Sequence, residues 1–113
     1  MTVRETELTP QQFERLAERF RALGETARLQ IMNCLRRGVK TVTAIVDETG
    51  LGQANVSKHL RVLFDVGFVR RRKEGVRTVY ELSDRTVFDL CDIVCGRITA
   101  DVRAQRKLLQ GRG

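Results

Sequence analysis

The stretch LGQANVSKHLRVLFDVGFVRRRKEGVRTVYEL, residues 51–82, places a helical pattern directly before a strand pattern. Between Gly52 and Gly67, apolar residues recur at helical spacing, namely Val56, Leu60, Leu63 and Phe64. β-Branched and aromatic residues then flank a Lys-Glu-Gly turn, which is typical of a two-stranded hairpin. The stretch therefore predicts a helix followed by a β-hairpin.

A second short helix is predicted just before this one, in the segment TVTAIVDETG, residues 41–50. It is expected to end where Gly50 offers the positive φ that a tight turn needs. Two short helices joined by a tight glycine turn form a helix-turn-helix, here residues 42–66. The hairpin over residues 67–82 then forms a wing.

Two helices are predicted before this motif. Thr9, Pro10 and Gln12 supply a capping hydroxyl, a proline at the first helical position and a reciprocal cap, so a helix should span 9–24. A second helix is expected over about 25–37. The apolar residues expected to face inward from it are Leu29, Met32 and Leu35.

One long helix is predicted at the end of the chain, over about 84–110. Its apolar stripe runs through Val87, Cys91, Val94, Ile98 and Val102. The fold class is thus mainly α with a small β-hairpin: a winged helix-turn-helix with added terminal helices, in one domain over 1–113. So small a core cannot bury the long stripe alone, which favours a symmetric dimer built on the terminal helices.

Composition narrows the class of partner. The chain of 113 residues has a net charge of +7, and 17 of its 21 basic residues are arginine. Such a balance suits a polyanion, either nucleic acid or an anionic membrane surface. The start MTVRETELTP lacks the apolar core of a signal peptide, and no apolar run approaches a membrane span, so we expect a cytoplasmic protein. Three cysteines, an odd number, fit free thiols in a reducing compartment.

The first turns of the second motif helix carry polar side chains suited to reading bases. In helix-turn-helix proteins this end of the recognition helix enters the major groove. Gln and Asn bond adenine, Lys reaches guanine, Ser is versatile, and Ala contacts a thymine methyl. The alternative is an ordinary solvated face, which the glycine turn and the basic hairpin make less favourable. The predicted base readers are Gln53, Ala54, Asn55, Ser57 and Lys58.

His59 is the only histidine, and without partners it forms neither a metal site nor a catalytic base. We expect it to bond backbone or phosphate, and we include Arg61 in the same DNA-binding surface. His59 has no carboxylate or nucleophile partner in any recognisable motif, and the chain has no phosphate-cradling glycine loop, so no enzyme is indicated.

The hairpin concentrates positive charge, which Glu74 alone is expected to offset. A charge run is usually a solvated face. However, three consecutive arginines on a strand must point to both faces, so at least one needs an anionic neighbour, and DNA phosphates meet that need. The predicted phosphate contacts are Arg70, Arg71, Arg72, Lys73 and Arg77.

These residues resemble the arsenic/zinc-repressor (ArsR/SmtB) family of bacterial transcription factors. The resemblance rests on RALGETARLQIMNCL at 21–35, on the stretch 51–82 and on the long last helix. It implies a homodimer that represses an operon by binding an inverted repeat of double-stranded DNA. An inducer, often a metal ion, releases such a repressor.

Two inducer sites known in the family are missing here. One uses Cys-Val-Cys on the first motif helix, where this chain has TVT at 41–43. The other, a zinc site on the last helices, begins Asp-x-His, and here Thr86 replaces the histidine. The distal histidine pair falls on Arg97 and Ala100, so Asp84 alone remains, and one carboxylate holds no zinc.

Cysteine thiols are the remaining inducer candidates. Cys91 and Cys95 lie at i and i+4 on the last helix, and thiophilic ions such as As(III), Sb(III), Cd(II) or Pb(II) prefer such ligands. A third sulfur would come from Cys34 or from the other subunit.

Three alternatives stay open for these thiols and for the fold. The same thiols are open to oxidants or sulfur species, which would make a redox sensor on this scaffold. They are also small residues that pack well in a core, above all Cys34. A third alternative is an interaction module that kept the fold and lost DNA binding.

Overall fold

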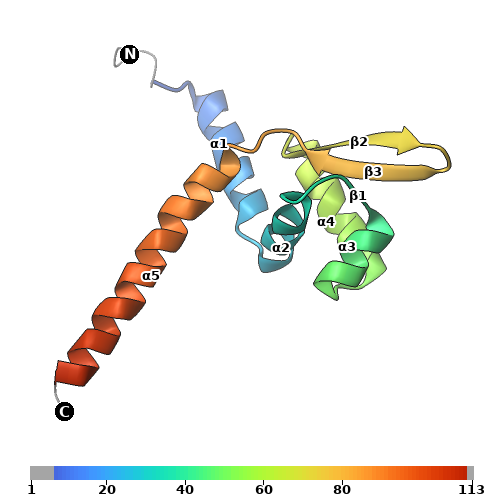
Figure 1. Ribbon diagram of the computed structural model, residues 1–113. Coiled ribbons are helices and arrows are strands. Elements are labelled where there is room, and N and C mark those ends of the chain that lie inside the picture. The colour runs from blue at the N-terminus through green and yellow to red at the C-terminus, as the bar shows by residue number, and fades with distance from the viewer. Residues whose placement is uncertain (1–6, 112–113) are drawn as a thin grey trace. The chain divides into compact units, whose positions relative to one another are not determined.

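The computed structural model describes residues 7–111, and the chain divides after Ser83 into two compact units (Figure 1). The one-domain organisation over 1–113 stays a prediction. Most of MTVRETELTP lies outside the described residues. The first unit contains the helices α1 (Pro10–Leu23), α2 (Thr26–Leu35), α3 (Val42–Thr49) and α4 (Gln53–Asp65), and the strands β1 (Lys40–Thr41), β2 (Val69–Glu74) and β3 (Arg77–Leu82). The second contains α5 (Val87–Gly111).

The start of α1 is capped as its sequence predicts. Thr9 Oγ1 accepts the backbone N–H of Gln12 at 3.1 Å, and the Gln12 side chain accepts the N–H of Thr9 at 2.8 Å. This reciprocal cap satisfies two donors that a helix start otherwise leaves free. The helix buries only Ala22 and leaves Phe13, Leu16 and Phe20 exposed.

The core of the first unit lies where α2, α3 and α4 meet. Ile31, Leu35, Ile45 and Leu63 are at most 1% exposed. Of the four inward positions predicted on α4, Val56, Leu60 and Leu63 are confirmed as buried, whereas Phe64 is only half-buried.

One inward position predicted on α2 is wrong. Leu29 is 41% exposed, whereas Met32 and Leu35 are buried as expected. The buried residues of α2 are Ile31, Met32, Cys34 and Leu35. They all lie in the second half of the helix, and Leu29 precedes them.

Two glycines shape the helix-turn-helix. Gly50 ends α3 with a φ of 73°, the left-handed conformation predicted for the turn. Gly67, with a φ of 90°, follows α4, and its N–H bonds the carbonyl of Phe64. The next N–H, from Phe68, bonds the carbonyl of Leu63. This pair of bonds is a Schellman motif, which turns the chain from the recognition helix directly into the wing.

The wing differs from the predicted two-stranded hairpin. It is a three-stranded antiparallel sheet in the order β1-β3-β2, because Lys40 and Thr41 pair with Tyr80 and Val79. The turn is also shifted, since Glu74 pairs with Arg77 and leaves only Gly75 and Val76 in a two-residue loop. Gly75 has a φ of 65°, which suits the first central position of a tight hairpin turn.

The last helix, α5, begins three residues later than predicted. Asp84 precedes the helix and accepts the N–H of Thr86 at 2.9 Å, a local turn that competes with helix. Along α5, Ile93, Val94 and Ile98 are more than half exposed. None of the helices within residues 7–111 has the length and apolarity needed to cross a membrane.

Candidate nucleic-acid interface

The base readers predicted on α4 are all exposed on its first two turns. The opposite side of the same turns is anchored in the core by Val56 and Leu60, both 0% exposed. The positive end of a helix dipole also lies at this terminus, where it favours an anion. The fold thus presents Gln53, Ala54, Asn55, Ser57 and Lys58 from a rigid support.

Within residues 7–111, His59 bonds a side chain and no backbone group, so the expected backbone bond is wrong and the alternative phosphate contact stays a prediction. Its Nδ1 lies 3.2 Å from Nη1 of Arg28. Because a guanidinium only donates, Nδ1 is the acceptor and the ring proton sits on Nε2. Arg28 also donates to the carbonyls of Ala22 and Arg21 at 2.6 and 3.2 Å. Arg28 therefore ties the end of α1 to the recognition helix.

Arg61 lies further along α4 and is exposed. Its Nε is 3.1 Å from a carboxylate oxygen of Asp65, one helical turn away. Both side chains are more than half exposed, so this pair contributes little to stability and leaves the guanidinium open to other partners.

The wing arginines divide between two faces of the hairpin. On one face, Arg70 Nε and Arg72 Nη1 both bond Oε1 of Glu81, at 2.8 and 2.9 Å. Arg72 also bonds Glu74 at 3.1 Å. The expectation that Glu74 alone offsets the basic hairpin is therefore wrong, because Glu81 lies directly opposite Arg70 in the register.

On the other face, Arg71 packs over the ring of Phe64, with its guanidinium carbon 4.2 Å from the ring centroid. This cation–π contact joins the wing to the end of the recognition helix. One of the three consecutive arginines, Arg71, therefore has its partner within the protein.

Lys73 and Arg77 lie at the far end of the hairpin and are exposed. Within the described residues, neither forms an ion pair. These two side chains are the basic groups of the wing most open to phosphate.

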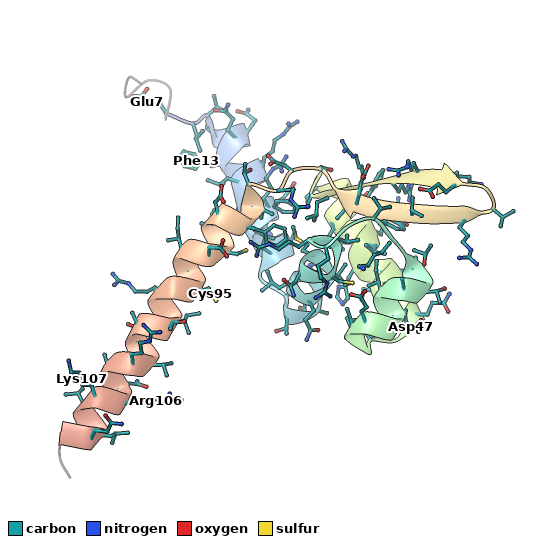
Figure 2. All side chains as sticks on the ribbon, viewed as in Figure 1. Glu7, Phe13, Asp47, Cys95, Arg106 and Lys107 are labelled. Atoms are coloured by element: carbon teal, nitrogen blue, oxygen red, sulfur yellow. The ribbon has the colours of Figure 1, made fainter. Side chains whose placement is uncertain are left out.

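A cleft of about 490 Å³ opens beside α3 and the start of β3, near the loop of the hairpin. The segment TVT, which replaces the family's thiolate site, lines it together with Asp47, which Figure 2 labels on α3. Hydroxyls and one carboxylate are hard ligands, so this cleft does not suit the soft ions that the family's cysteines bind. The other lining residues are Ala44, Arg77 and Thr78.

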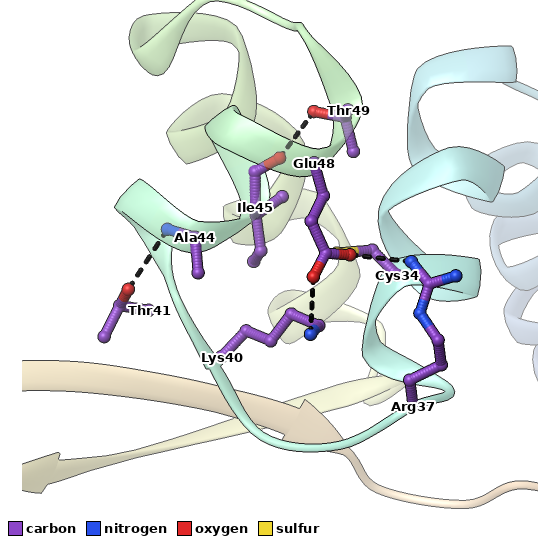
Figure 3. Close-up of polar contacts among 8 residues, drawn as sticks. All are labelled: Cys34, Arg37, Lys40, Thr41, Ala44, Ile45, Glu48 and Thr49. Atoms are coloured by element: carbon purple, nitrogen blue, oxygen red, sulfur yellow. Dashed lines mark hydrogen bonds and ion pairs between the residues drawn. The ribbon is translucent and has the colours of Figure 1, made fainter.

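Cys34 lies in a polar cluster between α2 and α3 (Figure 3). Its thiol donates to Glu48 Oε2 at 2.9 Å, and Arg37 and Lys40 each bond Glu48 at 2.7 Å. Burial and the bond to Glu48 raise the pKa of Cys34 to about 11, while bonds from Cys34, Lys40 and Arg37 lower the pKa of Glu48 to about 2. A thiol held protonated is a poor nucleophile and a poor metal ligand.

Cys91 and Cys95 lie one turn apart on α5. Cys91 is half-buried, and Cys95, which Figure 2 labels, is exposed. Across residues 7–111, one chain assembles no cluster of three or more His, Cys, Asp or Glu side chains that would hold a metal ion.

The sequence did not predict the roles of three residues at this surface. Glu81 bonds the wing arginines, Arg28 bonds His59, and the ring of Phe64 packs against Arg71. The strand register offers a signal for Glu81, since it falls opposite Arg70. Arg28 and His59 are 31 positions apart, and no local pattern links them.

Known regulatory proteins resemble the chain over much of its length. The profile described as bacterial regulatory protein, arsR family, matches residues 25–71. A probable mercury resistance operon repressor of Streptomyces lividans is 38% identical over 63% of this chain and 57% of its own length. An uncharacterized HTH-type transcriptional regulator of Methanocaldococcus jannaschii is 35% identical over 74% of this chain and 96% of its own.

Among solved structures, the homodimeric winged helix-turn-helix DNA-binding domain of a possible ArsR-family regulator from Mycobacterium bovis superposes with a TM-score of 0.70. It is 28% identical and covers 94% of this chain and 93% of that domain.

Proposed function

The chain belongs to the ArsR family of helix-turn-helix transcriptional regulators, a family of non-enzymes, and on that premise we propose that it is a homodimeric repressor that binds an inverted repeat. The observation that carries DNA binding is the pairing of an exposed polar start of α4 with a wing whose Lys73 and Arg77 are exposed and form no ion pair within residues 7–111. In this arrangement α4 reads base edges and the wing holds phosphates.

Exposed apolar side chains support the dimer. Phe13 and Phe20 on α1, and Ile93 and Ile98 on α5, are 52–71% exposed in the single chain. On each helix taken by itself, exposed apolar side chains of this kind mark an interaction surface. A two-fold dimer would cover them and hold two recognition helices about 34 Å apart, one turn of DNA. The related Mycobacterium bovis domain is described as homodimeric.

Selection of duplexes from a randomised library tests DNA binding. Purified protein should enrich an inverted repeat whose half-sites lie about one helical turn apart. Failure to enrich any sequence, with no binding to random duplex at low salt, would contradict the proposal and favour an interaction module.

Sedimentation tests the dimer. Ile98→Asp should favour monomers and weaken binding to the selected duplex, because a carboxylate would be desolvated at the interface. Thr99→Asp is the matched control, since it introduces the same charge at an exposed position that lies about 100° or more around α5 from both Ile93 and Ile98, and it should leave the dimer intact. A stable Ile98→Asp dimer with unchanged DNA affinity would contradict this interface.

For induction, we propose that Cys91 and Cys95 bind a soft ion such as As(III), Sb(III), Cd(II) or Pb(II). Their spacing of one turn and the exposure of Cys95 support ligation. The relative from Streptomyces lividans is a probable mercury repressor, and mercury is also a soft ion. Cys34 is left out of this site because its thiol is buried and bonded to Glu48.

Titration of reduced protein on its selected duplex tests this site, with thiolate absorption and DNA release followed together. Cys91→Ser and Cys95→Ser should each keep DNA binding and lose release by As(III) or Cd(II), while Cys34→Ser should respond like the parent. Release by oxidants alone would favour the redox sensor. If both α5 variants still release DNA like the parent, Cys91 and Cys95 are packing residues and do not bind the inducer.

A further inference from the structure

The wing contains a carboxylate arranged like a DNA phosphate. Oε1 of Glu81 accepts Nε of Arg70 at 2.8 Å and Nη1 of Arg72 at 2.9 Å. Two guanidinium groups converging on one anionic oxygen are also the arrangement in which arginines bind a phosphate. The wing thus carries its own anion at the arginines predicted to bind DNA.

The strand register holds this carboxylate in place. Glu81 lies directly opposite Arg70 and diagonally from Arg72, which is within reach of a long side chain. The Glu81 side chain is 25% exposed, whereas Arg70 and Arg72 are 64% and 51% exposed. The carboxylate therefore stays near the sheet while both guanidinium groups remain open to solvent. The bond from Arg70 also lowers the pKa of Glu81, which keeps it charged.

We propose that Glu81 competes with DNA phosphates for Arg70 and Arg72 and so limits how tightly the wing holds DNA of any sequence. The inference rests on the proposed DNA-binding function. Phosphate contacts position a protein without reading sequence, so Glu81 should lower the affinity for every duplex by the same factor. The residue acts through the two arginines and needs no contact with DNA.

The chain offers a matched control on the same hairpin. Among the residues that the structure describes, Arg72 is the one side chain that bonds Glu74, at 3.1 Å, and the Glu74 side chain is 58% exposed. Glu74→Gln therefore makes the same charge change as Glu81→Gln, at nearly the same place, but leaves the shared bond to Glu81 intact. A difference between the two variants separates the competition from the effect of net charge alone.

The experiment measures binding of a random-sequence duplex by fluorescence anisotropy between 50 and 200 mM salt. Glu81→Gln should bind roughly threefold to tenfold more tightly, with a log–log salt slope steeper by about one per subunit. Glu74→Gln should change affinity less, and the gain for Glu81→Gln should be equal on the selected inverted repeat.

Equal behaviour of the two variants, or weaker binding by Glu81→Gln, would overturn the inference while leaving DNA binding intact. Absence of DNA binding by the parent protein would instead overturn the proposed function and this inference with it. Thermal unfolding of each variant checks that the hairpin is folded. If Glu81→Gln unfolds, Glu81→Thr removes the charge with a residue that favours strands and should give the same gain.

Discussion

Two glutamates in this protein each bond two positively charged side chains, one pair between helices and the other on the wing. Glu48 joins Arg37 and Lys40 to the buried thiol of Cys34 between α2 and α3. Glu81 joins Arg70 and Arg72 on the open face of the wing. In both clusters one carboxylate bonds two positively charged side chains, but the clusters lie in different parts of the fold.

The environment of the cations decides what each glutamate does. Lys40 is 17% exposed, so its charge depends on Glu48 for compensation. Arg70 and Arg72 are more than half exposed and are solvated with or without Glu81. We therefore expect Glu48 to stabilise the fold and Glu81 to adjust binding.

The largest effect should come from Glu48→Gln. It removes the charge that compensates Lys40 and the best acceptor for the Cys34 thiol, so the melting temperature should fall by several degrees. Calorimetry measures this shift. Asp65→Asn, which breaks the exposed pair with Arg61, is the control and should shift the melting temperature far less. Equal shifts would remove the distinction between the clusters.

Stability should fall at both extremes of pH. The pKa of Glu48 is lowered from 4.5 to about 2, so its contribution is present above pH 4.5 and is lost as the pH falls toward 2. The pKa of Cys34 is raised from 9.0 to about 11, so its contribution is present below pH 9.0 and is lost as the pH rises through 11.

Denaturant unfolding from pH 2 to 11 measures both losses. Glu48→Gln should flatten the acid side more than Glu81→Gln does, because the pKa of Glu81 is lowered less markedly. Cys34→Ser should flatten the alkaline side, since a serine hydroxyl does not titrate in this range. If Cys34→Ser loses stability at alkaline pH as the parent does, titration of the thiol is not the cause of that loss.

A smaller effect is expected where the wing meets α4. A double-mutant cycle of Arg71→Ala and Phe64→Leu should give a coupling of about 0.5–1 kcal/mol, because the guanidinium lies over the ring. Denaturant unfolding measures it. Arg70→Ala with Phe64→Leu is the control pair and should show no coupling, since Arg70 bonds Glu81 on the other face.

Local signals predicted most of the fold. Thr9 with Gln12, Gly50 and Gly67 each mark a helix end that the structure places within a residue or two. The recognition helix could be predicted because its apolar positions repeat regularly between two glycines. In each case a few adjacent residues determine the backbone conformation.

What the sequence did not reveal depends on contacts between distant residues. β1 has only two residues, Lys40 and Thr41, which is too short for an alternating pattern. The bonds of Glu81 to the wing arginines could not be predicted, because they depend on the register of β2 and β3. The bond between Arg28 and His59 joins two helices that no sequence period connects.

The most direct test of the account compares Arg77→Ala on the wing with Gln53→Ala on α4, each on the selected duplex and on a scrambled one across a range of salt. Arg77→Ala should weaken both complexes alike and reduce the salt slope by about one per subunit, as loss of a phosphate contact requires. Gln53→Ala should cost roughly 1–3 kcal/mol on the selected duplex, little on the scrambled one, and leave the slope unchanged. Equal losses from both variants on both duplexes, or a parent slope near zero, would contradict the division between a helix that reads bases and a wing that holds phosphates.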